Sequence, residues 1–247
     1  GRTTSELATS YMSKETLVAM EHNIFTPGNY FYNGVGHVTV NYGKVLKIGY
    51  KGIIQEAKAA LEKCRISDSD YVTKKAFLEA VIESMDAAMM YADRYADLAA
   101  EMADKCVDVT RRAELTQISK NCRKVPRNGA EGFYEACQSF WFVQMLLQIE
   151  SSGHSISPGR FDQYMYEFYQ ADAARGMSRE ELLEIVELYF ISLNMDTDLY
   201  RGMQLGDNGQ SMVLGGFDLE GNSMFNELSA LCMDASLDLN VIDPKIN

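Results

Sequence analysis

Residues 133–160 read FYEACQSFWFVQMLLQIESSGHSISPGR, and the pattern of this stretch is the strongest indicator of the fold. From about Ala130 to about Glu150, apolar side chains point in nearly every direction around a helix. A helix that is apolar all round is buried in a large protein, because each of its faces needs an apolar neighbour. The residues from Ser151 to Arg160 are then mostly Ser, Gly, His and Arg. The stretch therefore predicts a buried central helix followed by a polar loop that enters the core.

Helical spacing of apolar residues recurs along most of the chain. It predicts further helices over about residues 44–64, 70–104, 108–122, 162–175, 178–194 and 222–239. Ser178 and Glu181 have the spacing of a capping box, which starts one of these helices. Short strands are predicted at 36–40, 155–157 and 211–214, and short strands between long helices favour an α/β arrangement. The predicted fold class is α/β and helix-rich.

Composition narrows the classes of function. The net charge of −12 argues against a nucleic-acid or anionic-membrane partner, because phosphate binding needs clustered Lys and Arg. The longest apolar run, near 140–147, is far shorter than the roughly 20 residues that span a bilayer. The first residues carry no apolar signal segment, and the five cysteines are widely spaced without a CxxC pair. We therefore expect a cytoplasmic protein with no disulfide framework and no structural metal.

Two polar motifs are candidate binding elements, and each has a purely structural alternative. Gly34 and Gly36 precede His37 at the start of a predicted strand. They form either a tight turn or a place where the backbone approaches a ligand that His37 faces. The loop after the central helix is either a self-satisfied hydrogen-bond network or a site presenting His154 or Ser155. A Ser/His hydrolase is not indicated, because the sequence contains no GxSxG.

Three stretches together resemble the glycyl radical enzymes. This family includes pyruvate formate-lyase, glycerol and propanediol dehydratases, choline trimethylamine-lyase and arylacetate decarboxylases. The stretches are GVGHVTVNY at 34–42, ESSGHS at 150–155 with GRFDQY at 159–164, and VLGG at 213–216 followed by the helix with Asn226, Glu227 and Leu228. Their order and separation match the family over nearly the whole chain.

The resemblance implies the fold and the site. The family fold is a ten-stranded β/α barrel wrapped in helices, and the motifs here belong to its first half. In diol-dehydratase-like members a histidine and a serine hydrogen-bond substrate hydroxyls, and the matching residues are His37 and Ser155. Tyr32 and Val35 are expected beside them. The implied activity is a lyase that cleaves a C–O, C–N or C–C bond of a small polar substrate, with a dehydratase favoured.

Other members of the family stay open as alternatives. A choline-type lyase would share the same elements, and an arylacetate decarboxylase would use the aromatic residues Tyr30, Phe31 and Tyr32.

The sequence also departs from the family pattern. The radical glycine loop (RVxG-type) and the Gly-Cys loop that carries the thiyl radical do not occur in residues 1–247, and neither does the usual acid/base glutamate. We therefore expect one partial domain over 1–247, with no catalytic residue and no bound cofactor of its own. In the complete enzyme, a separate radical SAM activating enzyme would install the glycyl radical.

The expected partners follow from this reading. They are a small-molecule substrate, the activating enzyme, the missing half on the same or a separate chain, and further copies in a homo-oligomer. The alternative is a truncated or split subunit, catalytically incompetent, that acts as a structural or interaction protein.

Overall fold

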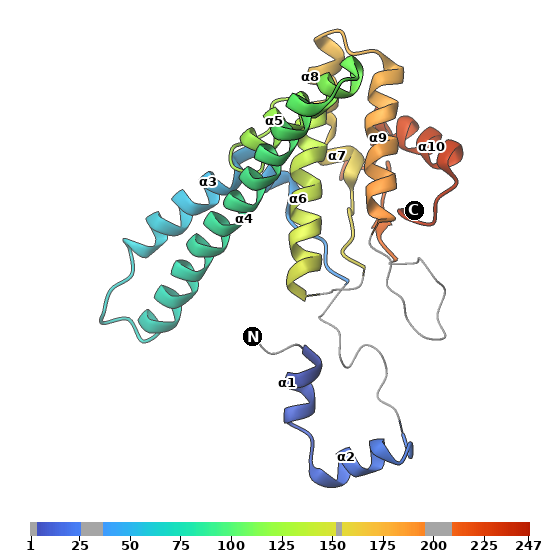
Figure 1. Cartoon of the computed structure of the whole chain (residues 1–247). Helices are drawn as coiled ribbons and strands as arrows, with labels where there is room; N and C mark the ends of the chain where they lie inside the picture. Colours follow the sequence, from blue (N-terminus) through green and yellow to red (C-terminus); the bar gives the residue numbers. More distant parts are fainter. Residues whose placement is uncertain (1–3, 26–36, 152–154, 196–208) are drawn as a thin grey trace.

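The computed structural model describes residues 4–25, 37–151, 155–195 and 209–247 (Figure 1). Helices dominate these residues, as predicted. The elements are α1 (Thr4–Ser10), α2 (Lys14–Glu21), α3 (Tyr42–Leu61), α4 (Tyr71–Lys105), α5 (Val109–Lys124), α6 (Phe133–Ser151), α7 (Phe161–Tyr164), α8 (Tyr166–Ala174), α9 (Arg179–Leu193), β1 (Ser211–Met212), α10 (Glu227–Leu239) and β2 (Lys245–Ile246). None of the described helices is long and apolar enough to cross a membrane.

Helix α6 lies between two groups of helices, with α4 and α5 on one side and α9 and α10 on the other (Figure 1). Aromatic rings fill the space where α6, α7 and α9 meet. The ring of Phe140 meets Tyr189 edge-on at a centroid distance of 5.0 Å, and Phe161 stacks on Tyr189 at 5.0 Å. Phe140 and Phe161 are fully buried. The predicted central helix is therefore the centre of the core.

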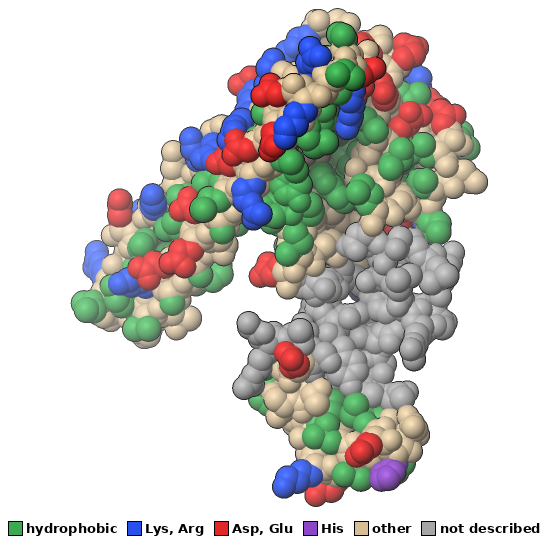
Figure 2. Space-filling model, viewed as in Figure 1, with side chains coloured by type: hydrophobic (Ala, Val, Ile, Leu, Met, Phe, Trp, Pro, Cys, Tyr) green, Lys and Arg blue, Asp and Glu red, His purple; other side chains and the backbone are tan. Residues whose placement is uncertain are grey.

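The expectation that α6 is buried on every side is wrong for its second half. Trp141, Met145 and Leu147 are only partly buried, and Ile149 is 62% exposed. The reason is that Leu147 and Ile149 face an apolar groove of about 610 Å³ between α6, α3 and α4, whereas Trp141 and Met145 line a groove on another side of the helix. Figure 2 shows hydrophobic side chains gathered in the hollow between the projecting α3–α4 hairpin and α6.

Local sequence signals explain most helix starts. Ser178 and Glu181 form the predicted capping box at α9. Asp70 precedes α4 as predicted but makes no capping hydrogen bond there, and its side chain instead pairs with Lys74. The last helix begins at Glu227 rather than near 222, because Asn226 accepts a hydrogen bond from the backbone of Ser229 and caps it.

Two helices depart from the predicted pattern. The predicted helix 162–175 is divided into α7 and α8 at Met165. Helix α3 begins earlier than expected, at Tyr42, and is kinked at Gly49, whose φ of 62° is left-handed. A β-carbon at Gly49 would lie 2.4 Å from the backbone of Asn128, so this close approach requires glycine.

The extended parts of the chain form four parallel segments, residues 38–40, 157–159, 211–213 and 245–247. Thr39 bridges to Ser157, Gly159 bridges to Met212, and β1 pairs with β2, all in parallel. Helices connect each segment to the next, as in a β/α arrangement. The strands predicted at 36–40 and 155–157 are thus reduced to single bridges, and β1 is shorter than predicted. That these segments belong to a ten-stranded barrel stays a prediction.

Candidate functional site

The predicted site residues His37 and Ser155 lie at the same end of two neighbouring parallel segments. His37 stands two residues before Thr39, and Ser155 stands two residues before Ser157. Thr39 and Ser157 are paired by a parallel β-bridge. Both have left-handed backbones, with φ of 58° and 56°. Such values are uncommon outside glycine and persist only where the surrounding structure holds them, often at functional sites. The structure therefore brings these two residues to one place and in similar backbone conformations.

The third parallel segment repeats this feature. Gly209 stands two residues before Ser211 and has a φ of 60°. Residues 37, 155 and 209 mark the end at which the chain enters the parallel segments, and we call this end the entry end. His37 is exposed there, whereas Ser155 is only 3% exposed. The entry end thus combines an accessible imidazole with a buried serine.

Ser157 ties three of the parallel segments together. Its backbone N–H donates to the carbonyl of Val38 at 2.9 Å, and its hydroxyl donates to the carbonyl of Ser155 at 3.2 Å. The same hydroxyl oxygen accepts a hydrogen bond from the N–H of Ser211 at 3.0 Å. One side chain therefore fixes both the turn at Ser155 and its distance from the third segment. Sequence reasoning assigned no role to Ser157.

Asp162 joins the second and third sequence motifs. Its buried carboxylate accepts hydrogen bonds from the N–H of Gly215 at 2.6 Å and from the hydroxyl of Ser229. Beside it, the Arg160 guanidinium donates to the carbonyl of Gly215 at 3.0 Å. These contacts hold the left-handed turn at Gly215 and Gly216 against the start of α7. The GRFDQY and VLGG motifs are therefore in direct contact.

Not all of the predicted site can be placed. Tyr32 and Val35 lie outside the described residues, as does His154, the alternative to Ser155. Their positions beside the substrate stay predictions.

The described cysteines have the character of packing residues. Cys122, Cys137 and Cys232 are buried, and burial raises the pKa of each thiol, for Cys122 to about 11. A protonated, enclosed thiol is neither nucleophilic nor readily oxidised. Cys64 and Cys106 are partly buried, and their thiols donate to the carbonyls of Ala60 and Asp108.

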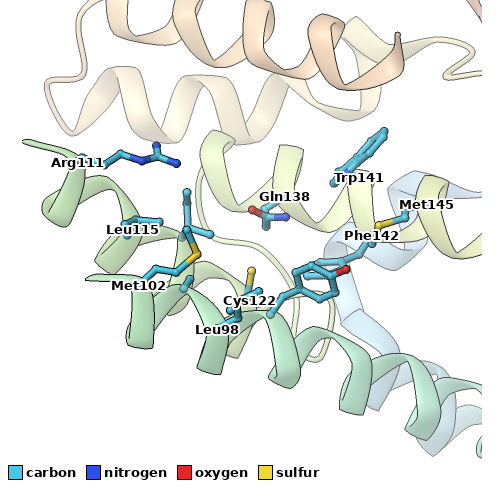
Figure 3. A pocket seen from close by; sticks show the side chains of 12 residues that line it. Leu98, Met102, Arg111, Leu115, Cys122, Gln138, Trp141, Phe142 and Met145 are labelled. Atoms are coloured by element: carbon cyan, nitrogen blue, oxygen red, sulfur yellow. The ribbon is translucent and has the colours of Figure 1, made fainter. Parts of the chain in front are cut away.

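A separate groove of about 240 Å³ lies between α4, α5 and α6 (Figure 3). Arg111 stands at one end of it, and Trp141 and Met145 stand at the other. Arg111 is the only charged residue in its lining, which is otherwise mostly apolar, and the groove shares no residue with the entry end. It therefore lacks the convergent polar groups that orient a small polar substrate.

Comparison with known proteins decides the family. All of residues 1–247 match the family model for pyruvate formate lyase-like proteins. The chain belongs to this family. The resemblance inferred from the three motifs is thus confirmed.

The similar proteins include dehydratases and lyases. The chain is 35% identical to (2S)-3-sulfopropanediol dehydratase of Klebsiella oxytoca, over 99% of this chain and 31% of that protein. It is also 35% identical to isethionate sulfite-lyase of Bilophila wadsworthia, over 77% of this chain and 24% of that protein.

Solved structures give the same picture. A structure concerning 1,2-propanediol dehydration in Roseburia inulinivorans has 49% identity and a TM-score of 0.89 over 100% of this chain. The glycerol-bound B12-independent glycerol dehydratase from Clostridium butyricum has 45% identity and a TM-score of 0.87, also over 100%. The chain covers 32% of each, so it spans about a third of the length of these relatives.

Proposed function

We propose that the intact protein containing this chain is a glycyl radical lyase of the dehydratase type, which removes water from a small substrate bearing neighbouring hydroxyl groups. The observation that carries the proposal is the 49% and 45% identity to two diol or polyol dehydratase structures over the whole chain. Identity to indoleacetate decarboxylase of Tractidigestivibacter scatoligenes is only 25%. Since side chains in the cavity select the substrate, the closer likeness favours a diol over an aromatic acid.

His37 and Ser155 are the residues that would hold the substrate. Imidazole and hydroxyl groups can both donate and accept hydrogen bonds, so each can bind a substrate hydroxyl. His37 is exposed and Ser155 is buried at the same end of neighbouring segments, which suits a substrate that enters from the His37 side. Tyr32 and Val35 would complete the wall around the substrate.

The reacting groups would come from outside residues 1–247. A cysteine thiyl radical would take a hydrogen atom from the carbon that bears one hydroxyl group. Water would then leave from the neighbouring carbon, and return of the hydrogen atom would yield an aldehyde. That return would also restore the thiyl radical for the next turnover. A glycyl radical, which a separate radical SAM enzyme would install, would form the thiyl at the start by taking the hydrogen atom of the cysteine thiol. The buried thiols of Cys122, Cys137 and Cys232 do not suit this role.

The proposal is tested with the intact protein, purified without oxygen and treated with an activating enzyme. Glycyl radical formation is followed by electron paramagnetic resonance, and aldehyde release from glycerol and 1,2-propanediol is followed by a coupled reductase. We expect aldehyde from at least one diol. A radical with turnover of an arylacetate alone would overturn the dehydratase assignment. A protein that forms no radical would instead be the catalytically incompetent alternative.

The role of His37 is tested by substitution. His37→Ala should lower turnover of the diol by at least tenfold and leave the far-UV circular dichroism unchanged, because the side chain is exposed. His22→Ala is the matched control, since His22 is an exposed histidine at the end of α2. Equal activity of the two variants would remove His37 from the site.

A further inference from the structure

Two glutamines are buried in the core directly beside the entry end. Gln144 lies in the middle of α6 and Gln210 stands at the start of the third parallel segment, and each is 1% exposed. A buried amide is costly unless its donors and its acceptor are all paired. Both glutamines meet this requirement, and they do so through each other.

The orientation of Gln144 is dictated by its neighbours. Its Nε2 donates to the carbonyl of Ile156 at 2.8 Å, and a carbonyl can only accept. Its Oε1 therefore faces the buried hydroxyl of Tyr42, which donates to it at 2.7 Å. Burial raises the pKa of Tyr42 far above its ordinary value, so the phenol keeps its proton. The amide of Gln144 has one satisfactory orientation.

Gln210 is fixed in the same way. Its Nε2 donates to the carbonyl of Leu193 at 2.8 Å, which leaves its Oε1 to accept the second N–H of Gln144 at 2.6 Å. The backbone N–H of Gln210 also approaches the carboxylate of Asp243 at 3.3 Å. The two amides form a directed chain of hydrogen bonds from Tyr42 to α9 and Asp243.

This chain of hydrogen bonds reaches all four parallel segments. Tyr42 follows the first, Ile156 precedes the second, Gln210 precedes the third and Asp243 precedes the fourth. The contact with the Ile156 carbonyl is the one closest to the candidate site, because Ile156 follows Ser155 directly. Holding that carbonyl, together with the Ser157 contact to the Ser155 carbonyl, fixes the two peptide groups that directly follow Ser155.

From this geometry we infer that Gln144 is a positioning residue, which holds Ser155 in its left-handed turn by binding the carbonyl of Ile156. Gln144 itself lies inside α6 and does not need to touch substrate. The inference deepens the proposed function and rests on it only for the nature of the substrate, because the hydrogen bonds are present in the chain itself.

The test compares Gln144→Met with Gln138→Met in the intact protein. Both replace a glutamine of α6 by an unbranched apolar residue, but Gln138 lies in the α4–α6 groove, away from the Ile156 carbonyl. Hydrogen exchange is measured by mass spectrometry without substrate. We expect Gln144→Met to speed exchange at least tenfold in peptides covering residues 155–159 and 210–213, and Gln138→Met to leave them unchanged. No increase in Gln144→Met, or an equal increase in both variants, would overturn the inference.

A kinetic measurement separates positioning from general damage. In the activated enzyme, Gln144→Met should raise KM for the diol at least tenfold and change kcat less, because Ser155 is displaced while the reacting groups are intact. An unchanged KM would count against the inference. If the unmutated protein turns over no diol, the proposed function fails, but the exchange experiment still decides the role of Gln144.

A second variant covers the case in which Gln144→Met does not fold. Gln144→Glu keeps the shape of the side chain, but a carboxyl group offers at most one donor hydrogen to the two acceptors that it faces, the Ile156 carbonyl and the Gln210 Oε1. It should speed exchange in the same two peptides. Exchange that is unchanged there in a folded Gln144→Glu protein would likewise overturn the inference.

Discussion

Helix α6 depends on a carboxylate supplied by another helix, and removing it should weaken the core. Asp172 of α8 is 7% exposed, and its Oδ2 accepts hydrogen bonds from the N–H groups of Phe133 at 2.6 Å and Tyr134 at 3.4 Å. These N–H groups belong to the first turn of α6, where a helix has no internal partners for them. A β-carbon at Gly132 would lie 2.3 Å from the carboxylate, so glycine is needed for this approach.

The magnitude follows from the contacts. A hydrogen bond to a charged group contributes about 1.5–3 kcal/mol, and a negative charge at a helix N-terminus contributes about 0.3–1 kcal/mol. Asp172→Ala removes both contributions, so we expect it to lower the free energy of unfolding by about 2–4 kcal/mol. Asp172→Asn keeps one acceptor oxygen without the charge and should cost about half as much.

Unfolding can be followed by the fluorescence of Trp141, the only tryptophan of the chain, which lies on α6 itself. Urea titrations of residues 1–247 give the free energy for each variant. Arg175→Ala is the control, because Arg175 pairs with the same carboxylate from a side chain that is 57% exposed, and its removal leaves both hydrogen bonds to the α6 backbone in place. If Asp172→Ala costs no more than Arg175→Ala, the carboxylate does not stabilise α6 as argued.

Two further predictions concern the parallel segments and the buried thiols. Gly159 has a φ of +66°, and a β-carbon there would lie 2.7 Å from Thr39 Cγ2. Gly159→Ala should therefore lower the free energy of unfolding by about 1–2 kcal/mol from backbone strain, plus the cost of the clash. Adding Thr39→Ser, which removes that methyl group, should restore only the part of the free energy of unfolding that was lost to the clash. If the double variant regains no stability in the same urea titration, this account is wrong. Burial raises the pKa of Cys122 to about 11, above an unfolded value of about 8.5. The unfolded chain then loses the thiol proton first, so this contribution to stability is complete below about pH 8.5 and is lost as the pH rises toward 11. Between these pH values, the free energy of unfolding of Cys122→Ala should fall less than that of the unmutated chain. If the free energy of unfolding falls equally steeply with pH in both proteins, Cys122 does not make this contribution.

The helices were predictable where local signals act alone. The capping box of Ser178 and Glu181 needs only a spacing of three residues, and the structure has it. The kink at Gly49 was not predictable, because it depends on a distant loop. The N–H groups of Tyr50 and Lys51, freed by the kink, donate to the carbonyls of Pro126 and Arg127. The residues around Gly49 do not predict that this loop will be the partner.

The candidate site, like the helices, was predictable only in part. The resemblance identified His37 and Ser155, and the structure brings them to the same end of paired segments. Gln144 left a weaker signal, an amide in the middle of an apolar helix, which implies a buried partner. The partners themselves, Tyr42 and Gln210, are 102 and 66 residues away in the chain, so only the fold could reveal them.

Because the parallel segments are short, polar side chains are needed to define how they pair. The first two segments meet at one bridge, and β1 and β2 pair over only two residues. So few backbone hydrogen bonds define the register of a sheet weakly, and a slip of one residue would turn each side chain to the other face. The side chains of Ser157, Gln144 and Gln210 supply the missing constraints, because each has partners that only one register satisfies. The entry end is therefore held by side chains more than by strands.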